Sequence, residues 1–344
     1  TVVAKTTGST ARVILPNGRE LPLFRPLGAN IREQFRVLRL AAELEAQILV
    51  IECMALQPEL QWLSDRWFFH ATHGVLSNCR PDHLDVMGPT SADVADALAG
   101  SIPRSGVLFT GERQFLPRIR GACADRGTEL VEATEADVHA IGEQELSGFQ
   151  HDEHPQNVAL ALAICERLGA DRAEALRAMW DAAPDAGAKF IMHLDFFGRD
   201  IIFVNGFAAN DPESSEETWR DALRVYGDQR RAVALINTRA DRSDRSRQHA
   251  EAIGQWSGVD EVLVMGTGTA IFSRAAIQHG FDGTRLSMAE GASARDVLES
   301  LLSYASEGPL LVVGLCNIGG EGLKLVELIR NRSRLLGAGG DIAA

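Results

Sequence analysis

Four ligand-capable side chains stand close together in the segment "SNCRPDHLDVMGPT" at residues 77–90: Asn78, Asp82, His83 and Asp85. They follow the apolar run "GVL", which is typical of the end of a buried strand, and Glu52 ends a similar run, "ILVIE". A carboxylate and an imidazole there could bind Mg²⁺ ions that bridge nucleotide phosphates, because Mg²⁺ prefers oxygen ligands and needs only one or two carboxylates. The alternative is structural: Glu52 pairs with an arginine and His83 caps a helix.

Two further segments carry groups suited to anions. "KTTGST" (5–10) holds a lysine, hydroxyls and a glycine beside an expected strand, and such loops bind phosphate through backbone N–H groups. It is equally compatible with a plain turn, and the P-loop pattern GxxxxGK[ST] occurs nowhere in the chain. "RADRSDR" (239–245) presents three arginines, whose planar forks suit carboxylates and phosphates, with a solvated helix start as the alternative.

The elements that would position these groups alternate between short apolar runs and longer helical stretches. Strands are predicted at 46–55, 72–78, 105–111, 200–206, 232–239, 261–267 and 308–317, and helices at 91–102, 155–169, 172–183 and 293–305, among others. Apolar strands separated by helices indicate α/β architecture with a mainly parallel sheet covered on both faces. In such sheets ligands bind beyond the carboxyl ends of the strands, so Glu52 and His83 are expected to project from neighbouring strand ends.

Chain length and local composition predict two domains. At roughly 100–200 residues per domain, 344 residues suggest two, and "APDAGAKF" (183–190) is the best candidate for the boundary. The segment 15–26 is expected to form a hairpin with Asn17-Gly18 as its turn.

Composition excludes some classes of protein. A net charge of −13 argues against a non-specific nucleic-acid binder, although a local basic cleft for an anionic substrate stays open. Five scattered cysteines without a CxxC pair are typical of reduced thiols in the cytoplasm, and Cys53 is expected to be a buried apolar residue. No apolar run of about 18 residues occurs, so no membrane span is expected.

Taken together, the segments resemble a known family. "KTTGST", "IECMAL", "SNCRPDHLDVMGPT", "HPQNVALALA", "APDAGAKF", "FVNGFAANDPESS" and "NTRADRSDR" occur in the same order as in the ligase subunit of poly-γ-glutamate synthase, also called the capsule biosynthesis ligase. That subunit belongs to the Mur ligase and folylpolyglutamate synthase superfamily. The resemblance runs from about residue 3 to about residue 325.

The resemblance implies a fold and a reaction. It implies a Mur-ligase-like central domain that binds ATP and Mg²⁺ at 1–183, and a Rossmann-like C-terminal domain at 184–344. The implied reaction activates a glutamate γ-carboxylate with ATP to an acyl phosphate, which the amine of the next glutamate attacks to form an amide. The alternatives are a ligase of the Mur or folylpolyglutamate type with another acceptor, and an inactive scaffold subunit of the membrane synthase.

The resemblance also implies roles for particular residues. It implies Glu52 and His83 as metal ligands, with Asp82 and Asp85 orienting the histidine. The implied cofactor-binding residues are Lys5, Thr6, Thr7, Asn157, Asn205, Asn210 and Asp211. The implied catalytic residues are His83, Asp85, Arg239 and Arg242, with Arg245 in the same turn. Asp85 is one candidate for the base that takes the proton of the amine.

Partners and location follow from the same resemblance. We expect glutamate and poly-γ-glutamate as substrates, small membrane subunits as partners and no nucleic acid, and a homo-oligomer stays open. We expect a cytoplasmic protein at the inner face of the cell membrane, held by partners or by an N-terminal anchor upstream. The family's P-loop lies just ahead of "KTTG", so we expect it upstream too. The helix 91–102 lacks the lysine that helps bind metal in many Mur ligases, which puts the second metal site in doubt.

Overall fold

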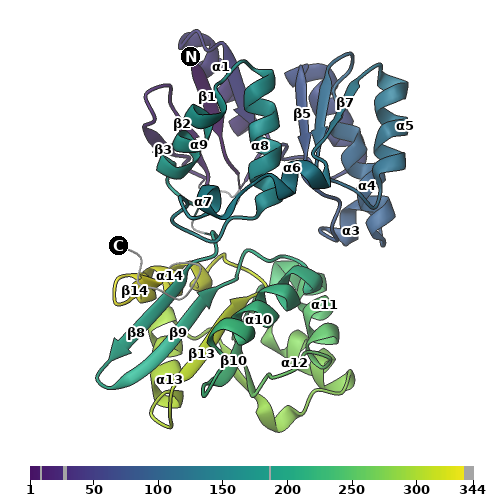
Figure 1. Ribbon diagram of the computed structural model, residues 1–344. Helices are drawn as coiled ribbons and strands as arrows, with labels where there is room; N and C mark the ends of the chain where they lie inside the picture. The colour runs from purple at the N-terminus through teal and green to yellow at the C-terminus, as the bar shows by residue number, and fades with distance from the viewer. Residues whose placement is uncertain (8–9, 26–28, 186, 337–344) are drawn as a thin grey trace. The chain divides into compact units, whose positions relative to one another are not determined.

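The computed structural model describes residues 1–7, 10–25, 29–185 and 187–336, and for Asp85 the backbone alone (Figure 1). The chain forms two compact units, Thr1–Glu132 and Ala133–Ala344. The domain boundary predicted between residues 183 and 184 stays a prediction.

The first sheet of the N-terminal unit has the strand order β3-β2-β1-β4. Its strands are β1 (Val2–Lys5), β2 (Arg12–Ile14), β3 (Glu20–Pro22) and β4 (Ile48–Ile51). Helix α1 (Arg32–Glu43) packs Val37 and Ala41 against Val3 and Val13 of this sheet. The predicted hairpin turn is confirmed: β2 and β3 pair antiparallel, and Gly18 takes the left-handed conformation that the turn needs, with φ 78°. The first strand, β2, lies before the predicted segment 15–26.

The second sheet of this unit is parallel, in the order β5-β6-β7. Its strands are β5 (His73–Leu76), β6 (Val107–Thr110) and β7 (Glu129–Glu132). The helical elements are α2 (Pro58–Ser64), the π-helix η1 (Asp65–Phe69), α3 (Leu84–Met87), α4 (Ser91–Leu98), the 3₁₀ turn η2 (Ala99–Ser101) and α5 (Leu116–Arg126). The α4 and α5 helices bury Ala95 and Ile119 with Leu108 of β6 in a small apolar core.

Strands β4 and β5 each end one of these sheets, which corrects the expectation that they are neighbours. Among the described residues no backbone ladder joins them, so the strand leading to Glu52 and the strand leading to His83 belong to different sheets. Val50 and Val75 on these edge strands are 56% and 55% exposed. Cys53, just past β4, is exposed as well, so its predicted burial was wrong.

The C-terminal unit starts with a group of helices. They are α6 (Glu135–His139), α7 (Glu143–Leu146), α8 (Pro155–Arg167) and α9 (Arg172–Asp181). Their shared core contains Ile141, Val158, Leu162 and Leu176. Asp171 caps α9 by accepting backbone N–H bonds from its first turn, so the helix starts where the sequence supplies an N-cap carboxylate.

The remainder of this unit is built on a seven-stranded sheet in the order β12-β11-β10-β13-β9-β8-β14. The strands are β8 (Ile191–Phe196), β9 (Arg199–Asn205), β10 (Arg231–Thr238), β11 (Glu261–Gly266), β12 (Leu286–Glu290), β13 (Leu310–Leu315) and β14 (Arg334–Leu336). The first five in this order are parallel, and β8 pairs antiparallel with β9 and β14.

Helices cover both faces of this sheet (Figure 1). The helical elements are α10 (Pro212–Tyr226), η3 (Ala240–Arg242), α11 (Ser243–Ile253), α12 (Thr269–Gln278), η4 (Gly283–Arg285), α13 (Ala294–Tyr304) and α14 (Glu321–Arg330). Along β10, Ala234 and Ile236 pack with α10, α11 and α12, whereas Val233 and Leu235 pack with α13 and α14. Because both faces are buried, the run Ala232–Ile236 within β10 is apolar, and the predicted α/β class is confirmed.

Candidate active site

The carboxyl ends of β1 and β4 bring Glu52 to the loop after Lys5. The two strands are parallel, with Lys5 opposite Ile51, so the segments that follow them leave the sheet at the same edge. The Thr7 backbone N–H donates to Oε2 of Glu52 at 2.8 Å, and the Gln34 side chain donates to its carbonyl oxygen at 3.0 Å. The predicted phosphate loop and the predicted metal ligand therefore lie in contact.

Glu52 has the properties of a ligand for a hard cation. It is exposed, and its second carboxylate oxygen accepts no hydrogen bond from the described residues. Glu52 forms no ion pair with an arginine of the described residues, so the alternative in which it pairs with an arginine is not observed. No cluster of three His, Cys, Asp or Glu suited to a metal occurs in the described part of the chain. A single carboxylate still fits Mg²⁺, which keeps several waters and binds together with nucleotide phosphates.

Lys5 is buried beside this loop and shares one carboxylate with an arginine. Its Nζ lies 2.8 Å from Oε1 of Glu33, and Nε of Arg25 donates to Oε2 of the same carboxylate at 2.7 Å. Burial lowers the pKa of Lys5, against the opposing effect of Glu33. Burial also opposes ionisation of Glu33, but the hydrogen bonds from Arg25 and Lys5 outweigh it and lower the pKa of that carboxyl. Lys5, Arg25 and Glu33 together carry one net positive charge, which the nearby Glu52 carboxylate offsets.

The remaining loop residue, Thr6, is engaged with the hairpin. Its hydroxyl accepts the backbone N–H of Arg12 at 3.1 Å. This bond closes the start of the loop onto β2, so Thr6 positions the segment on which Thr7 donates to Glu52.

His83 sits at the tip of the turn after β5. Its backbone is left-handed, with φ 50°, and its N–H donates to Oδ1 of Asp82 at 3.0 Å. Nε2 of its ring lies 3.9 Å from the same oxygen. His83 occupies the N-cap position of α3, as the structural alternative expects, but its ring makes no capping hydrogen bond to that helix. Asp85 falls within α3, but its side chain lies outside the described residues.

Glu112 anchors this turn, a role that the sequence did not reveal. The carboxylate is buried; Oε2 accepts the N–H of Cys79 at 2.6 Å and Oε1 that of Phe115 at 2.9 Å. Burial and the adjacent carboxylate raise the pKa of the Cys79 thiol to about 12, so this cysteine is inert. Glu112 thereby ties the turn that carries His83 to the end of β6.

Two buried asparagines and a half-buried arginine form a network at the carboxyl ends of β10 and β13, here called the asparagine network: Asn237, Asn317 and Arg245. Nδ2 of Asn237 donates to the carbonyl oxygens of Asn317 and Gly319 at 2.6 and 2.9 Å. Nδ2 of Asn317 donates back to the Asn237 carbonyl at 3.0 Å. A Cβ on Gly322 would lie 2.5 Å from Nδ2 of Asn237, so only glycine fits beside it.

Arg245 joins this network to one of the predicted cofactor residues. Its Nη1 donates to Oδ1 of Asn317 at 2.9 Å and to Oδ1 of Asn210 at 2.8 Å. The loop before α10 and the arginine-rich turn after β10 are therefore brought together, as the rule on strand ends implies.

Other predicted residues have local partners. Asp211 caps α10, accepting the N–H of Ser214 at 2.8 Å, and Asn205, fully buried, donates to the Ala188 carbonyl at 2.9 Å. Asn157 donates to Glu153 at 3.0 Å in the first turn of α8. These contacts do not test the predicted roles, which stay predictions.

The arginine-rich turn presents its first two arginines on the surface. Arg239 forms a two-pronged pair with Asp241, with distances of 3.0 and 2.7 Å, and Arg242 lies in η3. The hydrogen bonds from the Arg239 guanidinium hold the pKa of the Asp241 carboxyl below its usual range, although burial works against them. An exposed pair of this kind contributes little stability, so Arg239 can exchange Asp241 for a ligand at low cost.

In the glycine-rich turn after β11, a carboxylate of the protein accepts the backbone N–H groups. Oε1 and Oε2 of Glu290 accept the N–H groups of Gly268 and Thr269 at 2.9 and 2.8 Å. The side-chain hydrogen bond from Thr269, together with these backbone N–H groups, lowers the pKa of the Glu290 carboxyl. The backbone N–H groups of this turn are therefore already bonded to a carboxylate of the protein.

Comparisons with known proteins extend over nearly the whole chain. A family model, the poly-γ-glutamate synthase CapB C-terminal domain, matches residues 191–332. The capsule biosynthesis protein CapB of Bacillus anthracis is 36% identical over 330 residues, which are 95% of this chain and 70% of that protein. The PGA synthase CapB of Bacillus subtilis (strain 168) is 32% identical over 329 residues, 95% of this chain and 82% of that protein.

The fold also matches a solved structure. The bifunctional folylpolyglutamate synthase/dihydrofolate synthase of Yersinia pestis, complexed with AMPPNP and a Mn ion, superposes with a TM-score of 0.64 at 14% identity, covering 96% of this chain and 82% of that one. At this identity the likeness concerns the fold alone. The predicted fold of the Mur ligase and folylpolyglutamate synthase superfamily is therefore confirmed.

Proposed function

Because the chain belongs to the family of poly-γ-glutamate synthase CapB, we propose that it is an ATP-dependent ligase that forms γ-glutamyl amide bonds between glutamate units. The observation that carries this function is the similarity to two CapB proteins over 95% of the chain. In the proposed reaction the γ-carboxylate of a glutamate chain takes the terminal phosphoryl group of ATP, releasing ADP. The amine of the next glutamate then displaces phosphate and loses a proton.

Glu52 is the residue that we propose holds a divalent cation, as the exposed carboxylate with an oxygen open to a ligand. Bound there with nucleotide phosphates, Mg²⁺ would offset the negative charge gathered by triphosphate and carboxylate. The Thr7 N–H fixes the orientation of the carboxylate at 2.8 Å. With a divalent cation on Glu52, the net positive charge of Lys5, Arg25 and Glu33 would favour an anion beside the loop. His83 is the second proposed ligand, although imidazole is less suited to Mg²⁺ than a carboxylate.

The C-terminal unit supplies the proposed contacts to anionic groups. Arg239 and Arg242 are proposed to bind phosphate or the carboxylates of glutamate, since guanidinium forks match both. Asn205, Asn210, Asp211 and Asn157, with Thr6 and Lys5 of the N-terminal unit, are proposed to bind the nucleotide. Asp85 is proposed as the group that accepts the proton of the attacking amine.

Small membrane subunits are the partners that we propose, with the protein at the inner face of the cell membrane. This proposal rests on the family resemblance. Within the described residues, no helix combines the length and the apolar character that crossing a bilayer requires.

The test measures ADP release by the full-length native protein, supplied with ATP and Mg²⁺, in the presence and absence of glutamate or oligo-γ-glutamate. Glutamate-dependent ADP release in equal amounts with new γ-glutamyl amide is the expected result. A folded protein that binds ATP but releases no ADP with glutamate, alone and with its membrane partners, would exclude the ligase. Release that depends on a different acceptor amine would keep the enzyme class and overturn the substrate.

A further inference from the structure

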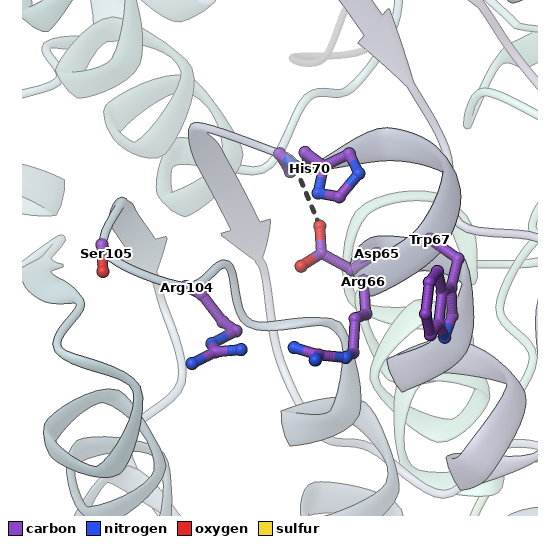
Figure 2. A pocket seen from close by; sticks show the side chains of 7 residues that line it. Asp65, Arg66, Trp67, His70, Arg104 and Ser105 are labelled. Atoms are coloured by element: carbon purple, nitrogen blue, oxygen red, sulfur yellow. Dashed lines mark hydrogen bonds between the residues drawn. The ribbon is translucent and has the colours of Figure 1, made fainter.

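A cavity of about 530 Å³ opens in the N-terminal unit, at the ends of β5 and β6 opposite those that lead to His83 and Glu112 (Figure 2). Its lining comes from two segments that precede strands: Asp65, Arg66, Trp67, His70 and Ala71 before β5, and Arg104 and Ser105 before β6. These segments lie at the amino ends of the parallel strands, whereas His83 and Glu112 follow the carboxyl ends. The cavity therefore lies at the opposite edge of the same sheet, separated by a four-residue strand that spans roughly 13 Å.

The π-helix η1 gives this cavity its shape. It continues α2 with a wider turn and ends at His70, whose backbone is left-handed with φ 47°. Such turns occur often at functional sites. Gly100 of η2 packs directly on α2, where an added Cβ would lie 3.0 Å from the Pro58 carbonyl oxygen. This close approach brings the segment that carries Arg104 beside Arg66.

Two guanidinium groups point into the cavity without a carboxylate partner. Figure 2 shows Arg66 and Arg104 directed toward the same space. Arg66 lies over the rings of Trp62 and Trp67, at 5.4 and 5.7 Å from their centroids, which holds it in place without neutralising it. Among the described residues, neither arginine forms an ion pair.

The one carboxylate that lines the cavity is already engaged. Oδ1 of Asp65 accepts the N–H of Ala71 at 2.9 Å, the dashed line of Figure 2. Its charge acts on the nearby Arg126, whose guanidinium donates to the carbonyl oxygens of Gly100 and Ile102. Asp65 and Arg126 offset one another, so Arg66 and Arg104 contribute two uncompensated positive charges in a chain of net charge −13.

We propose that this cavity is a second binding site for the glutamate polymer, in which Arg66 and Arg104 bind successive carboxylates of an oligo-γ-glutamate chain. The proposal rests on the proposed function, since it takes the product of that reaction as the ligand. Two guanidinium forks match two carboxylates, and the indole of Trp67, 64% exposed, offers an apolar surface for the methylene groups between them. A site at the far edge of the sheet holds polymer already made while the reacting end occupies the catalytic edge.

Equilibrium binding of penta-γ-glutamate without ATP tests the site, followed by tryptophan fluorescence and calorimetry. Arg66→Gln and Arg104→Gln should each weaken binding about tenfold, the loss of one charge-assisted contact, and binding should fall with added salt. The matched control is Arg120→Gln, which removes an exposed arginine of the same unit, paired with Glu132. Equal losses in all three variants, or none in the first two, would overturn the proposal.

Two further experiments identify the ligand of the cavity and distinguish this proposal from the proposed function. Inorganic phosphate and monomeric glutamate should displace the oligomer at least a hundredfold less effectively; equal displacement by phosphate would exclude a polymer site. Glu52→Gln should abolish ADP release and leave oligomer binding unchanged. If the protein is no ligase, ADP release is absent while binding still depends on Arg66. If the second site does not exist, ADP release persists, and neither Arg66→Gln nor Arg104→Gln changes the affinity for the oligomer.

Discussion

The strand ends that carry Asn237 and Glu52 treat their polar side chains differently. In the C-terminal unit, Asn237 and Asn317 are 1% and 3% exposed and bond to each other and to backbone carbonyls. In the N-terminal unit, Glu52 is exposed and accepts one hydrogen bond from the described residues. The C-terminal sheet is covered on both faces, whereas β4 and β5 leave Val50 and Val75 exposed.

This difference separates positioning from ligand binding. A buried polar group must be fully hydrogen-bonded, because leaving it unsatisfied costs about 1–3 kcal/mol, so a satisfied network has nothing left for a ligand. An exposed carboxylate is solvated by water and can exchange that water for a metal ion. We therefore expect substitutions at Glu52 to change activity with little effect on folding, and substitutions in the asparagine network to do the reverse.

Glu52→Gln should give the largest effect. We expect glutamate-dependent ADP release to fall about a thousandfold, because the amide cannot replace the negative charge that a divalent cation requires. The unfolding midpoint should stay within about 0.5 kcal/mol of the parent, as for other exposed positions. The matched control is Glu43→Gln at the exposed end of α1, which should keep full activity. Parent-like turnover in Glu52→Gln would remove this residue from the metal site.

Asn237→Ala should show the opposite pattern. It leaves the carbonyls of Asn317 and Gly319 without their donor, at about 1–3 kcal/mol each, so we expect about 4 kcal/mol of lost stability. Denaturant unfolding followed in the C-terminal unit would measure it as a lower midpoint at an unchanged slope. Asn331→Ala, at the exposed end of α14, is the control and should cost under about 1 kcal/mol. Comparable losses in both variants would contradict the claim that the network stabilises this unit.

The asparagine network also illustrates what one sequence leaves undetermined. The strand 232–239 could be predicted from its apolar run Ala232–Ile236, which is typical of a strand buried on both faces, and β10 covers Arg231–Thr238. Asn237 and Asn317 could be placed near strand ends but not together, because their contact depends on the pairing of β10 with β13, 80 residues apart. Strand order is a tertiary property that no local pattern encodes.

The N-terminal unit shows the same limit in another form. The resemblance identified Glu52 from its motif, and strand pairing then placed it beside Thr7. Yet the separation of β4 and β5 into two sheets was not foreseen, since both are short apolar runs that fit either arrangement. The anchoring role of Glu112 could not be predicted for a related reason. A carboxylate at a strand end has the same local sequence pattern whether it bonds to a turn or binds a ligand.

His249 should give the buried region a pH dependence. Its Nδ1 donates to the Arg245 carbonyl at 2.9 Å, Nε2 lies 2.9 Å from the Ser215 hydroxyl, and burial lowers its pKa from 6.5 to about 4. Its pKa is depressed on folding, so this contribution is fully present above pH 6.5. It is lost as pH falls toward 4, because the unfolded chain takes up the proton first.

The expected loss between these pH values is about 3 kcal/mol, at 1.4 kcal/mol per pKa unit. Unfolding of the C-terminal unit at several pH values would measure it, with His249→Gln flattening the slope and the exposed His139→Gln leaving it unchanged. An unaltered slope in His249→Gln would assign the pH dependence to other groups.

Helix caps give the smallest and most direct test of whether the two units fold separately. Thr90 caps α4 in the N-terminal unit and Ser293 caps α13 in the C-terminal unit, each in a capping box with an aspartate three residues later. Replacing either by alanine removes one hydrogen bond to an otherwise unsatisfied backbone N–H, which costs about 1 kcal/mol. If the units unfold independently, Thr90→Ala lowers only the melting transition of the first unit and Ser293→Ala only that of the second. Hydrogen exchange resolved by segment would distinguish them, and protection lost in both units from either variant would show that the two fold as one cooperative body.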